Sequence, residues 1–320
     1  FTTLSCADTA HAVRNKAVVN NTFFIIAHAV LSRVGYYHLN AYLPAVKRTI
    51  GPPVSLASVY NAYVFDMMIQ AILFEYISYF EVAFRAQMAH GLARQYGEFA
   101  HLVPDAFKNG MEHKDMVRRY RIERDRKRRT GESFVVHNMD KYGELPVWAA
   151  VELMPLGMLS KAFKNMAAGD ARDTVCDFFG FDSRVLSSWA HSVSFVRNEC
   201  AHQGILYGRA IPKPPMRQAS IEGIDSRSTF CQFAVLTSLF KKNMRDLSVP
   251  MICALRRAIE LPPFPLAWLF GFEDGQIGDA EPPWVRKLCE CAGIDGDITR
   301  RYMESEVAAE NMRNNWATEG

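Results

Sequence analysis

The residues with the clearest chemical potential are an arginine, an asparagine and a histidine in the order R-N-x-x-x-H. They are Arg197, Asn198 and His202, and they end a stretch from Trp189 whose apolar spacing predicts a helix. Asn198 and His202 are four residues apart and share a helix face, whereas Arg197 lies about 140° around the helix from His202. One helix therefore supplies an incomplete site. A second copy facing it would bring two arginines and two histidines around one phosphate.

Cleavage of RNA is the chemistry that these side chains suit best. RNA carries its own nucleophile, the ribose 2′-hydroxyl, so the protein needs a base for that proton and an acid for the leaving 5′-oxygen. Histidine titrates near neutral pH and serves in either role, while an arginine stabilises the negative charge that gathers around phosphorus. Asn198 would orient His202 or hold a phosphate oxygen. Because no carboxylate cluster suggests a metal, we expect neither a metal nor another cofactor.

A strongly basic run covers residues 113–129. Nine lysines and arginines stand there against three acidic residues, so the local formal charge is 9 − 3 = +6, compared with +3 for the whole chain. The cations are Lys114, Arg118, Arg119, Arg121, Arg124, Arg126, Lys127, Arg128 and Arg129. Such a helical run either gathers RNA through its phosphates, or is a solvated face with internal ion pairs, such as Glu123 with Arg119 and Lys127.

Helical periodicity dominates the chain, and convincing strand patterns are scarce. From Ser55, apolar residues recur at steps of three and four up to Tyr96-Gly97, which predicts one long helix. We expect the large aromatic residues in the core, namely Phe74, Phe80, Phe84, Trp148 and Trp189. Other helices are expected at 8–19, 22–35, 101–129, 147–167, 170–178, 182–203, 227–243, 247–261 and, with breaks, 282–316. The sequence therefore predicts an all-α protein.

Two zones rich in glycine and proline divide the chain. One is Gly51-Pro52-Pro53, and the other is the loop-like segment 208–228. We therefore expect an N-terminal helical region over 1–54, a helical core with the R-N-x-x-x-H motif over 55–210, and a C-terminal helical region over 211–320.

Composition indicates an ordinary globular protein. The chain of 320 residues is 49% hydrophobic and 22% charged, so a nucleic-acid partner must be recognised by local clusters of charge. The seven cysteines are odd in number and show no CxxC spacing, which favours reduced thiols in the cytoplasm. We see no signal peptide, and charges interrupt the apolar stretches. We expect a soluble, cytoplasmic protein without a membrane partner.

Four segments, in the same order, resemble the motifs of one known family. Residues 195–202, FVRNECAH, resemble the RN-x-CAH signature of the Abi-like (abortive infection) proteins, a branch of the HEPN proteins. Residues 31–42 resemble the family's NYYRLSGY element, and Phe65-Asp66 with 80–85 resembles its FD…IE-x-x-LR helix. Residues 145–161 resemble its PVW-x-x-E element.

The resemblance implies a HEPN-type helical bundle with additional N- and C-terminal helices. It also implies a metal-independent endoribonuclease that leaves a 2′,3′-cyclic phosphate and acts through a composite site in a homodimer. Arg197, Asn198 and His202 match the family's catalytic set. Members act in phage defence or as toxins, and some are restrained by a small non-coding RNA. RNA is therefore the expected substrate, and a non-coding RNA an expected regulator.

The sequence departs from the family after the motif. Members usually read H-x-RLWNR, whereas this chain has Gln203, Ile205 and Gly208 at positions that are polar or charged in the family. Arg209 is retained, and we expect it to bind RNA. Three further charged residues either support the phosphate site or form buried ion pairs between core helices, and they are Glu81, Arg85 and Glu152.

Two other functions fit parts of the same pattern. A non-catalytic RNA-binding protein of a defence system would use the basic run and Arg197 without cutting any bond. A helical protein–protein adaptor would carry the R-N-x-x-x-H motif only as the end of a helix. Product formation separates the first alternative from the nuclease, and RNA affinity separates the second.

Overall fold

The computed structural model describes residues 27–260 and 282–305. The helix expected at 8–19 and the end of the one expected at 282–316 lie outside these ranges. The chain divides into two compact units, Phe1–Asp66 and Met67–Gly320, with the boundary inside a long helix. The division into 1–54, 55–210 and 211–320 stays a prediction.

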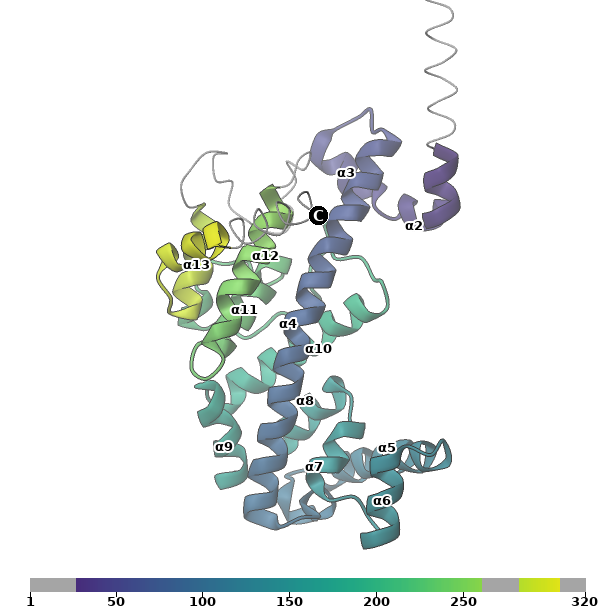
Figure 1. Ribbon diagram of the computed structural model, residues 1–320, viewed down its shortest axis with the longest axis vertical. Coiled ribbons are helices and arrows are strands. Elements are labelled where there is room, and N and C mark those ends of the chain that lie inside the picture. The colour runs from purple at the N-terminus through teal and green to yellow at the C-terminus, as the bar shows by residue number, and fades with distance from the viewer. Residues whose placement is uncertain (1–26, 261–281, 306–320) are drawn as a thin grey trace, which may run out of the picture. The chain divides into compact units, whose positions relative to one another are not determined.

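The described part of the chain is built from helices, which confirms the all-α class. The first unit contains α2 (Tyr36–Asn40), α3 (Leu43–Ile50) and the start of α4 (Leu56–Tyr96). The second contains the rest of α4 and the helices labelled in Figure 1 as α5 (Gly110–Arg129), α6 (Ser133–Tyr142), α7 (Val147–Ala150), α8 (Leu156–Asn165), α9 (Asp170–Phe179), α10 (Ser183–Ala201), α11 (Thr229–Phe240), α12 (Ser248–Glu260) and α13 (Pro283–Ala292). Short 3₁₀ turns, among them Val151–Leu153, connect them.

The first unit is tied together by residues of two segments that resemble family motifs. The buried hydroxyl of Tyr42 donates a hydrogen bond of 2.9 Å to the carboxylate of Asp66. The ring of Tyr42 also meets Tyr63 edge to face, with centroids 6.0 Å apart. A buried carboxylate needs such a partner, so this bond fixes α3 against the start of α4.

An aromatic cluster forms the core of the second unit around the C-terminal part of α4. Phe80 and Phe84 of α4 are fully buried and stack with ring centroids 5.3 Å apart. Phe163 of α8 meets Phe84 at 5.4 Å, and Phe179 of α9 meets Phe80 at 5.4 Å. Figure 1 shows α8 and α9 beside this part of α4. The cluster confirms the predicted core positions of Phe80 and Phe84.

Two of the aromatic residues expected in the core are instead exposed. Phe74 is 39% exposed and Trp148 is 53% exposed, whereas Trp189 is fully buried and donates a hydrogen bond to the carbonyl of Met216. Apolar spacing placed Phe74 on the buried stripe of α4, but α4 is apolar nearly all round and only one face is covered. The prediction was wrong for Phe74 and Trp148.

Two of the expected helices are broken. The helix expected over 101–129 begins only at Gly110, after two 3₁₀ turns, because the side chain of Asn109 caps the amides of Met111 and Glu112. The helix expected over 147–167 is divided into α7, a 3₁₀ turn and α8, with Pro155 at the N-cap of α8. α6 was not expected.

One described helix is long and apolar enough to meet a length-and-composition criterion for a membrane span. It is α4, in which 44% of the most apolar window is buried. The core helix of a soluble protein meets the same criterion, and α4 carries the aromatic core of the second unit. The cysteines within the described residues form no disulfide.

Candidate active site

The R-N-x-x-x-H motif occupies the last turn of α10, and local hydrogen bonds define both ends of that helix. Asp182 caps the start, because its side chain accepts from the amides of Arg184 and Val185. At the other end His202 is the C-cap residue. Gln203 follows with φ of 53°, and the amide of Gly204 donates to the carbonyl of Glu199 at 2.8 Å. This left-handed stop fixes the backbone that carries His202.

The turn after His202 is also anchored from α4. The side-chain amide of Gln70 donates a hydrogen bond of 2.8 Å to the carbonyl of Gly204. A Cβ added at Gly204 would lie 3.2 Å from the backbone carbonyl oxygen of Glu199 and would push aside the carboxylate of that residue. The backbone of the turn after His202 is therefore held by α4 as well as by α10.

Arg197 extends from α10 onto the surface of α4. Its Nε atom lies 3.4 Å from a carboxylate oxygen of Glu81, and its guanidinium carbon lies 5.9 Å from the ring centre of Phe74. One of its Nη atoms donates to the side chain of Asn198 at 3.4 Å. The side chain of Arg197 is therefore held by residues of α4, and with 29% of its surface exposed it still reaches solvent.

Asn198 and His202 are exposed side by side at the end of α10. The imidazole of His202 forms no hydrogen bond or ion pair with another residue in the described ranges, so both ring nitrogens are available. Arg197 thus contacts Asn198, and Asn198 and His202 follow one another on the same face, one turn apart, at the end of α10.

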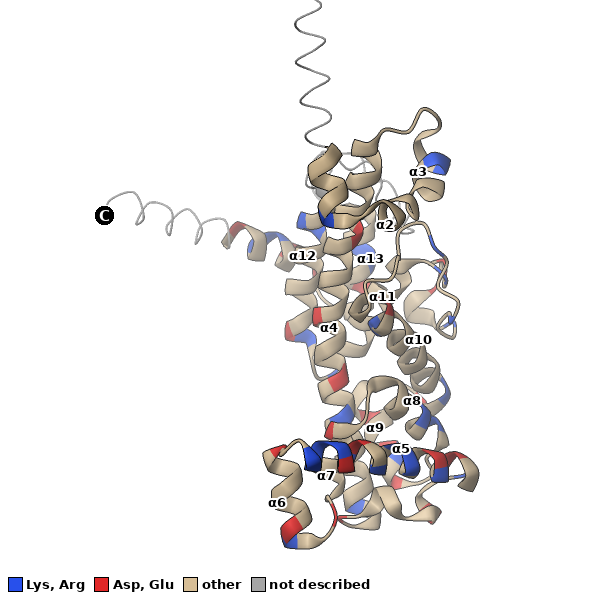
Figure 2. Cartoon of the chain, turned by 90° about the vertical axis from the view of Figure 1, so that its right-hand side faces the viewer, with Lys and Arg blue, Asp and Glu red and all other residues tan. Residues whose placement is uncertain are grey.

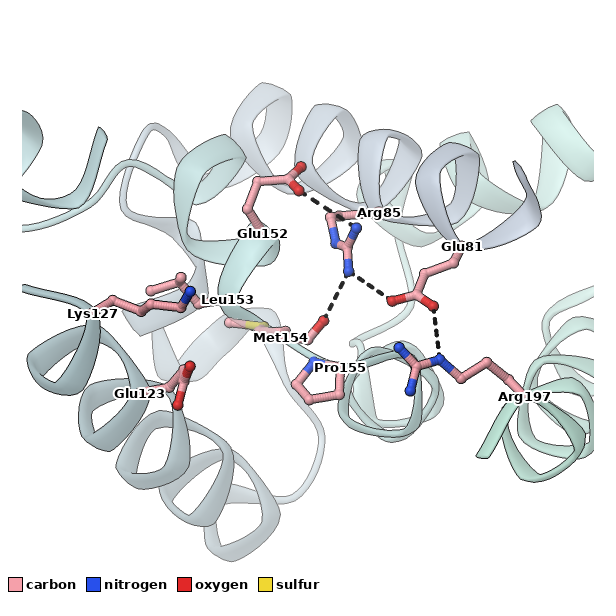
Figure 3. A pocket seen from close by; sticks show the side chains of 9 residues that line it. All are labelled: Glu81, Arg85, Glu123, Lys127, Glu152, Leu153, Met154, Pro155 and Arg197. Atoms are coloured by element: carbon pink, nitrogen blue, oxygen red, sulfur yellow. Dashed lines mark hydrogen bonds and ion pairs between the residues drawn. The ribbon is translucent and has the colours of Figure 1, made fainter. Parts of the chain in front are cut away.

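Three charged residues noted in the sequence extend inward from Arg197 in an alternating chain, as Figure 3 shows. Glu81 forms an ion pair with Arg197 through one oxygen, at 3.4 Å, and accepts a hydrogen bond of 2.8 Å from Arg85 through the other. Arg85 also donates to the carbonyls of Val151 and Met154, and it lies 3.5 Å from Glu152. They therefore form ion pairs with one another and also reach Arg197.

A cavity of about 260 Å³ opens beside this chain of charges. α4, α5, α10 and the segment before α8 all contribute to its wall. The lining residues are Glu81, Arg85, Glu123, Lys127, Glu152, Leu153, Met154, Pro155 and Arg197. Of the basic run, Lys127 is the cation that lines the same cavity as Arg197.

Most cations of α5 are already paired with carboxylates, and Figure 2 shows acidic residues interspersed among the basic ones of this helix. Asp115 pairs with Arg118 and Arg119, and Glu123 pairs with Arg126. Further pairs join Lys127 to Glu132 and Arg128 to Asp140. Lys114, Arg121 and Arg129 have no acidic partner within the described residues, and all three are exposed.

Arg124 differs from its neighbours because it belongs to a half-buried network. It binds Glu144 at 2.5 Å, and the buried hydroxyl of Tyr120 donates to the same carboxylate at 2.7 Å. Burial raises the pKa of Glu144, but the hydrogen bonds from Tyr120 and Arg124 outweigh it and lower the pKa overall. This network joins α5 to the segment before α7.

Arg209, the cation retained after the motif, is exposed and does not line the cavity. No group of metal-ligating side chains is found among the residues that the structure describes. Gln70 contacts the turn after the motif and Phe74 contacts Arg197. The sequence did not indicate either contact, because the partners are more than 100 residues apart in the chain.

The family model described as Abi-like protein matches residues 29–208, which include α4, the charged chain and the whole motif. Because the match covers more than half of the 320 residues, the chain belongs to the Abi-like family. This membership connects the protein in general terms with abortive infection, a form of phage defence. Comparisons with curated proteins and with solved structures gave no match.

Proposed function

We propose that the protein is a metal-independent endoribonuclease of the HEPN type that acts in abortive infection. The observation that carries the proposal is that Glu81 holds Arg197 beside Asn198, while the exposed imidazole of His202, one turn further on, is unpartnered among the described residues.

In the proposed reaction the ribose 2′-oxygen attacks the adjacent phosphorus. A histidine takes the proton of the 2′-hydroxyl while the new P–O bond forms, and the bond to the 5′-oxygen breaks. A second proton donor protonates that leaving oxygen, which gives a 2′,3′-cyclic phosphate and a 5′-hydroxyl. Arg197 stabilises the charge on the phosphoryl oxygens. Asn198 holds the Arg197 side chain or a phosphate oxygen.

The motif of a single chain contains one histidine, His202, whereas the reaction uses both a base and an acid. We infer that a second copy supplies the other histidine, so that the active site is composite and lies at a homodimer interface. Support comes from α4 beside Arg197, where Phe74 and Val82 are exposed. Covering these apolar side chains by self-association would remove them from water.

RNA is the proposed substrate, and the exposed cations of α5 are proposed to gather it by its phosphates. The residues are those expected from the sequence except Arg124, which pairs with Glu144 in the half-buried network. They are Arg118, Arg119, Arg121, Arg126, Lys127, Arg128 and Arg129, with Arg209 outside the helix. Control by a non-coding RNA, and action in the cytoplasm, are part of the same proposal.

The deciding experiment compares single-stranded RNA cleavage by the wild type and by His202→Ala in the presence of a chelator. The wild type should leave 2′,3′-cyclic phosphate ends, and His202→Ala should be inactive with an unchanged unfolding transition. His137→Ala is the matched control, because His137 is exposed on α6 and outside the cavity. Undiminished cleavage by His202→Ala would end the assignment.

Two further readouts separate the parts of the proposal. Sedimentation or light scattering should show a dimer, and substituting the exposed Val82 with Asp should give a folded monomer that does not cleave. RNA that binds with a steep salt dependence but is never cut would instead indicate a non-catalytic RNA-binding protein.

A further inference from the structure

The cavity beside Arg197 is nearly balanced in formal charge. Three carboxylates, those of Glu81, Glu123 and Glu152, face three cations, those of Arg85, Lys127 and Arg197. A phosphate inside the cavity would meet as much repulsion as attraction, so the scissile phosphate is placed at the solvent-facing side of Arg197. A neutral ligand that offers both hydrogen-bond donors and acceptors suits such a lining better.

Most of the charged groups around the cavity are already engaged. Both oxygens of Glu81 are paired, and Arg85 binds two carbonyls and a carboxylate. Both oxygens of Glu123 accept from Arg126.

Glu152 is the exception among the carboxylates. Its nearest cation among the described residues is Arg85, at 3.5 Å and without a hydrogen bond, and its side chain is 53% exposed. It therefore retains acceptor capacity for a ligand. Lys127, which also lines the cavity, donates one long hydrogen bond of 3.4 Å to Glu132. The other N–H groups of its ammonium are available to a ligand.

The apolar residues of the remaining wall are Leu153, Met154 and Pro155, which Figure 3 shows. Leu153 and Met154 are only 7% and 2% exposed, so the exposed ring of Pro155 provides most of the apolar surface. A volume of about 260 Å³ lies just below the range of roughly 300–1,000 Å³ that holds drug-sized ligands. The cavity thus suits one planar base lying against the ring of Pro155, because an apolar ring gains dispersion contact with the face of a base.

We propose that this cavity binds a guanine base next to the scissile linkage and that Glu152 determines the selectivity. The inference rests on the proposed ribonuclease function. Guanine is the RNA base whose pairing edge presents two adjacent N–H donors, N1 and N2, which a carboxylate accepts together, with O6 beside them for Lys127. Adenine, cytosine and uracil each place an acceptor where Glu152 requires a donor, so a desolvated acceptor faces the carboxylate.

The test is to sequence the ends of products from a randomised RNA. Wild type should cut next to guanine about tenfold more often than next to other bases, as expected for the loss of a charge-assisted hydrogen bond. Glu152→Gln should shift the preference toward adenine, because an amide accepts from N6 and donates to N1. Glu222→Gln, an exposed substitution outside the cavity, should leave the preference unchanged.

Cleavage without base preference, or a preference that survives Glu152→Gln, would overturn the inference while leaving the ribonuclease intact. A binding measurement covers the case in which no RNA is cut. His202→Ala should bind a short guanine-containing RNA more tightly than the same RNA with inosine, which lacks the N2 amino group. Equal affinities would exclude the guanine site independently of catalysis.

Discussion

The Nε atom of Arg197 lies 3.4 Å from an oxygen of Glu81, and the other oxygen of Glu81 lies 2.8 Å from Arg85. The carboxylate of Glu81 on α4 therefore holds Arg197 of α10, and Arg85 in turn holds that carboxylate. The side chain of Glu81 is only 12% exposed, so its two ion pairs are partly shielded from solvent. Glu81 is thus a positioning residue for the proposed catalytic arginine.

Glu81→Gln should lower the cleavage rate by roughly tenfold to hundredfold, because the uncharged amide no longer holds the guanidinium in place. Since the substrate's own contacts persist, kcat should fall more than KM rises. Steady-state kinetics on a short RNA would measure both. Glu112→Gln, an exposed change on α5 outside the cavity, is the control. A Glu81→Gln protein with wild-type kcat would show that Arg197 needs no such support.

Two arginines of α5 should respond in opposite ways to alanine substitution. Arg121 is exposed and has no acidic partner in the described ranges, so Arg121→Ala should weaken RNA binding and reduce its salt slope by about 1. Arg124→Ala should leave the slope nearly unchanged but lower the free energy of unfolding by about 2 kcal/mol, because the half-buried carboxylate of Glu144 loses its cation.

Filter binding at several salt concentrations and chemical denaturation would separate these effects. The reverse pattern, with Arg124→Ala changing the salt slope and Arg121→Ala changing only stability, would contradict the assignment of Arg124 to a structural network.

Long, regular features were predictable from the sequence. α4 and α10 lie within a residue or two of their expected ends, because apolar steps of three and four persist through them, and because Gly97 and Asp182 mark a stop and a start. Segments with internal caps were not predictable to the same degree. Asn109 and Pro155 each begin a new helix inside a stretch that reads as continuous.

The site was predictable as a motif but not as an arrangement. The spacing of Arg197, Asn198 and His202 is local and visible in the sequence. The contacts that hold Arg197 and the turn after His202 come from Glu81, Phe74 and Gln70, and they depend on how α4 packs against α10. Two ion pairs of α5 likewise use acids well outside the basic run, Asp140 and Glu144, whereas the pairs of Asp115 and Glu123 are local.

His101 should make the stability depend on pH. It is 1% exposed, and its ring lies 4.8 Å from that of Tyr120. Burial lowers the pKa of His101 from 6.5 to about 4, so on acidification the unfolded chain binds this proton before the folded chain does. The contribution is therefore complete above pH 6.5 and is lost as the pH falls toward 4.

The expected loss from His101 by pH 4 is about 3 kcal/mol. The free energy of unfolding would be measured at several pH values from 7 to 4 for wild type and His101→Asn. The loss is the amount by which the wild type is destabilised more than His101→Asn over this range. The comparison removes the contribution of carboxylates such as Glu144, which both proteins share. Parallel curves would show that His101 takes up its proton equally in both states.

Gly91 allows α4 to approach α9 closely. A Cβ added there would overlap the carbonyl oxygen of Ala171 and lie 3.1 Å from the carbonyl carbon, and backbone atoms cannot move aside as a side chain can. Gly91→Ala should therefore lower the free energy of unfolding by about 1–3 kcal/mol. Gly157→Ala is the matched control, because Gly157 is helical in α8 and has open space where its Cβ would lie. It should be neutral or stabilise by about 0.5–1 kcal/mol. Equal effects of the two substitutions on the denaturation midpoint would show that the helices do not meet at Gly91.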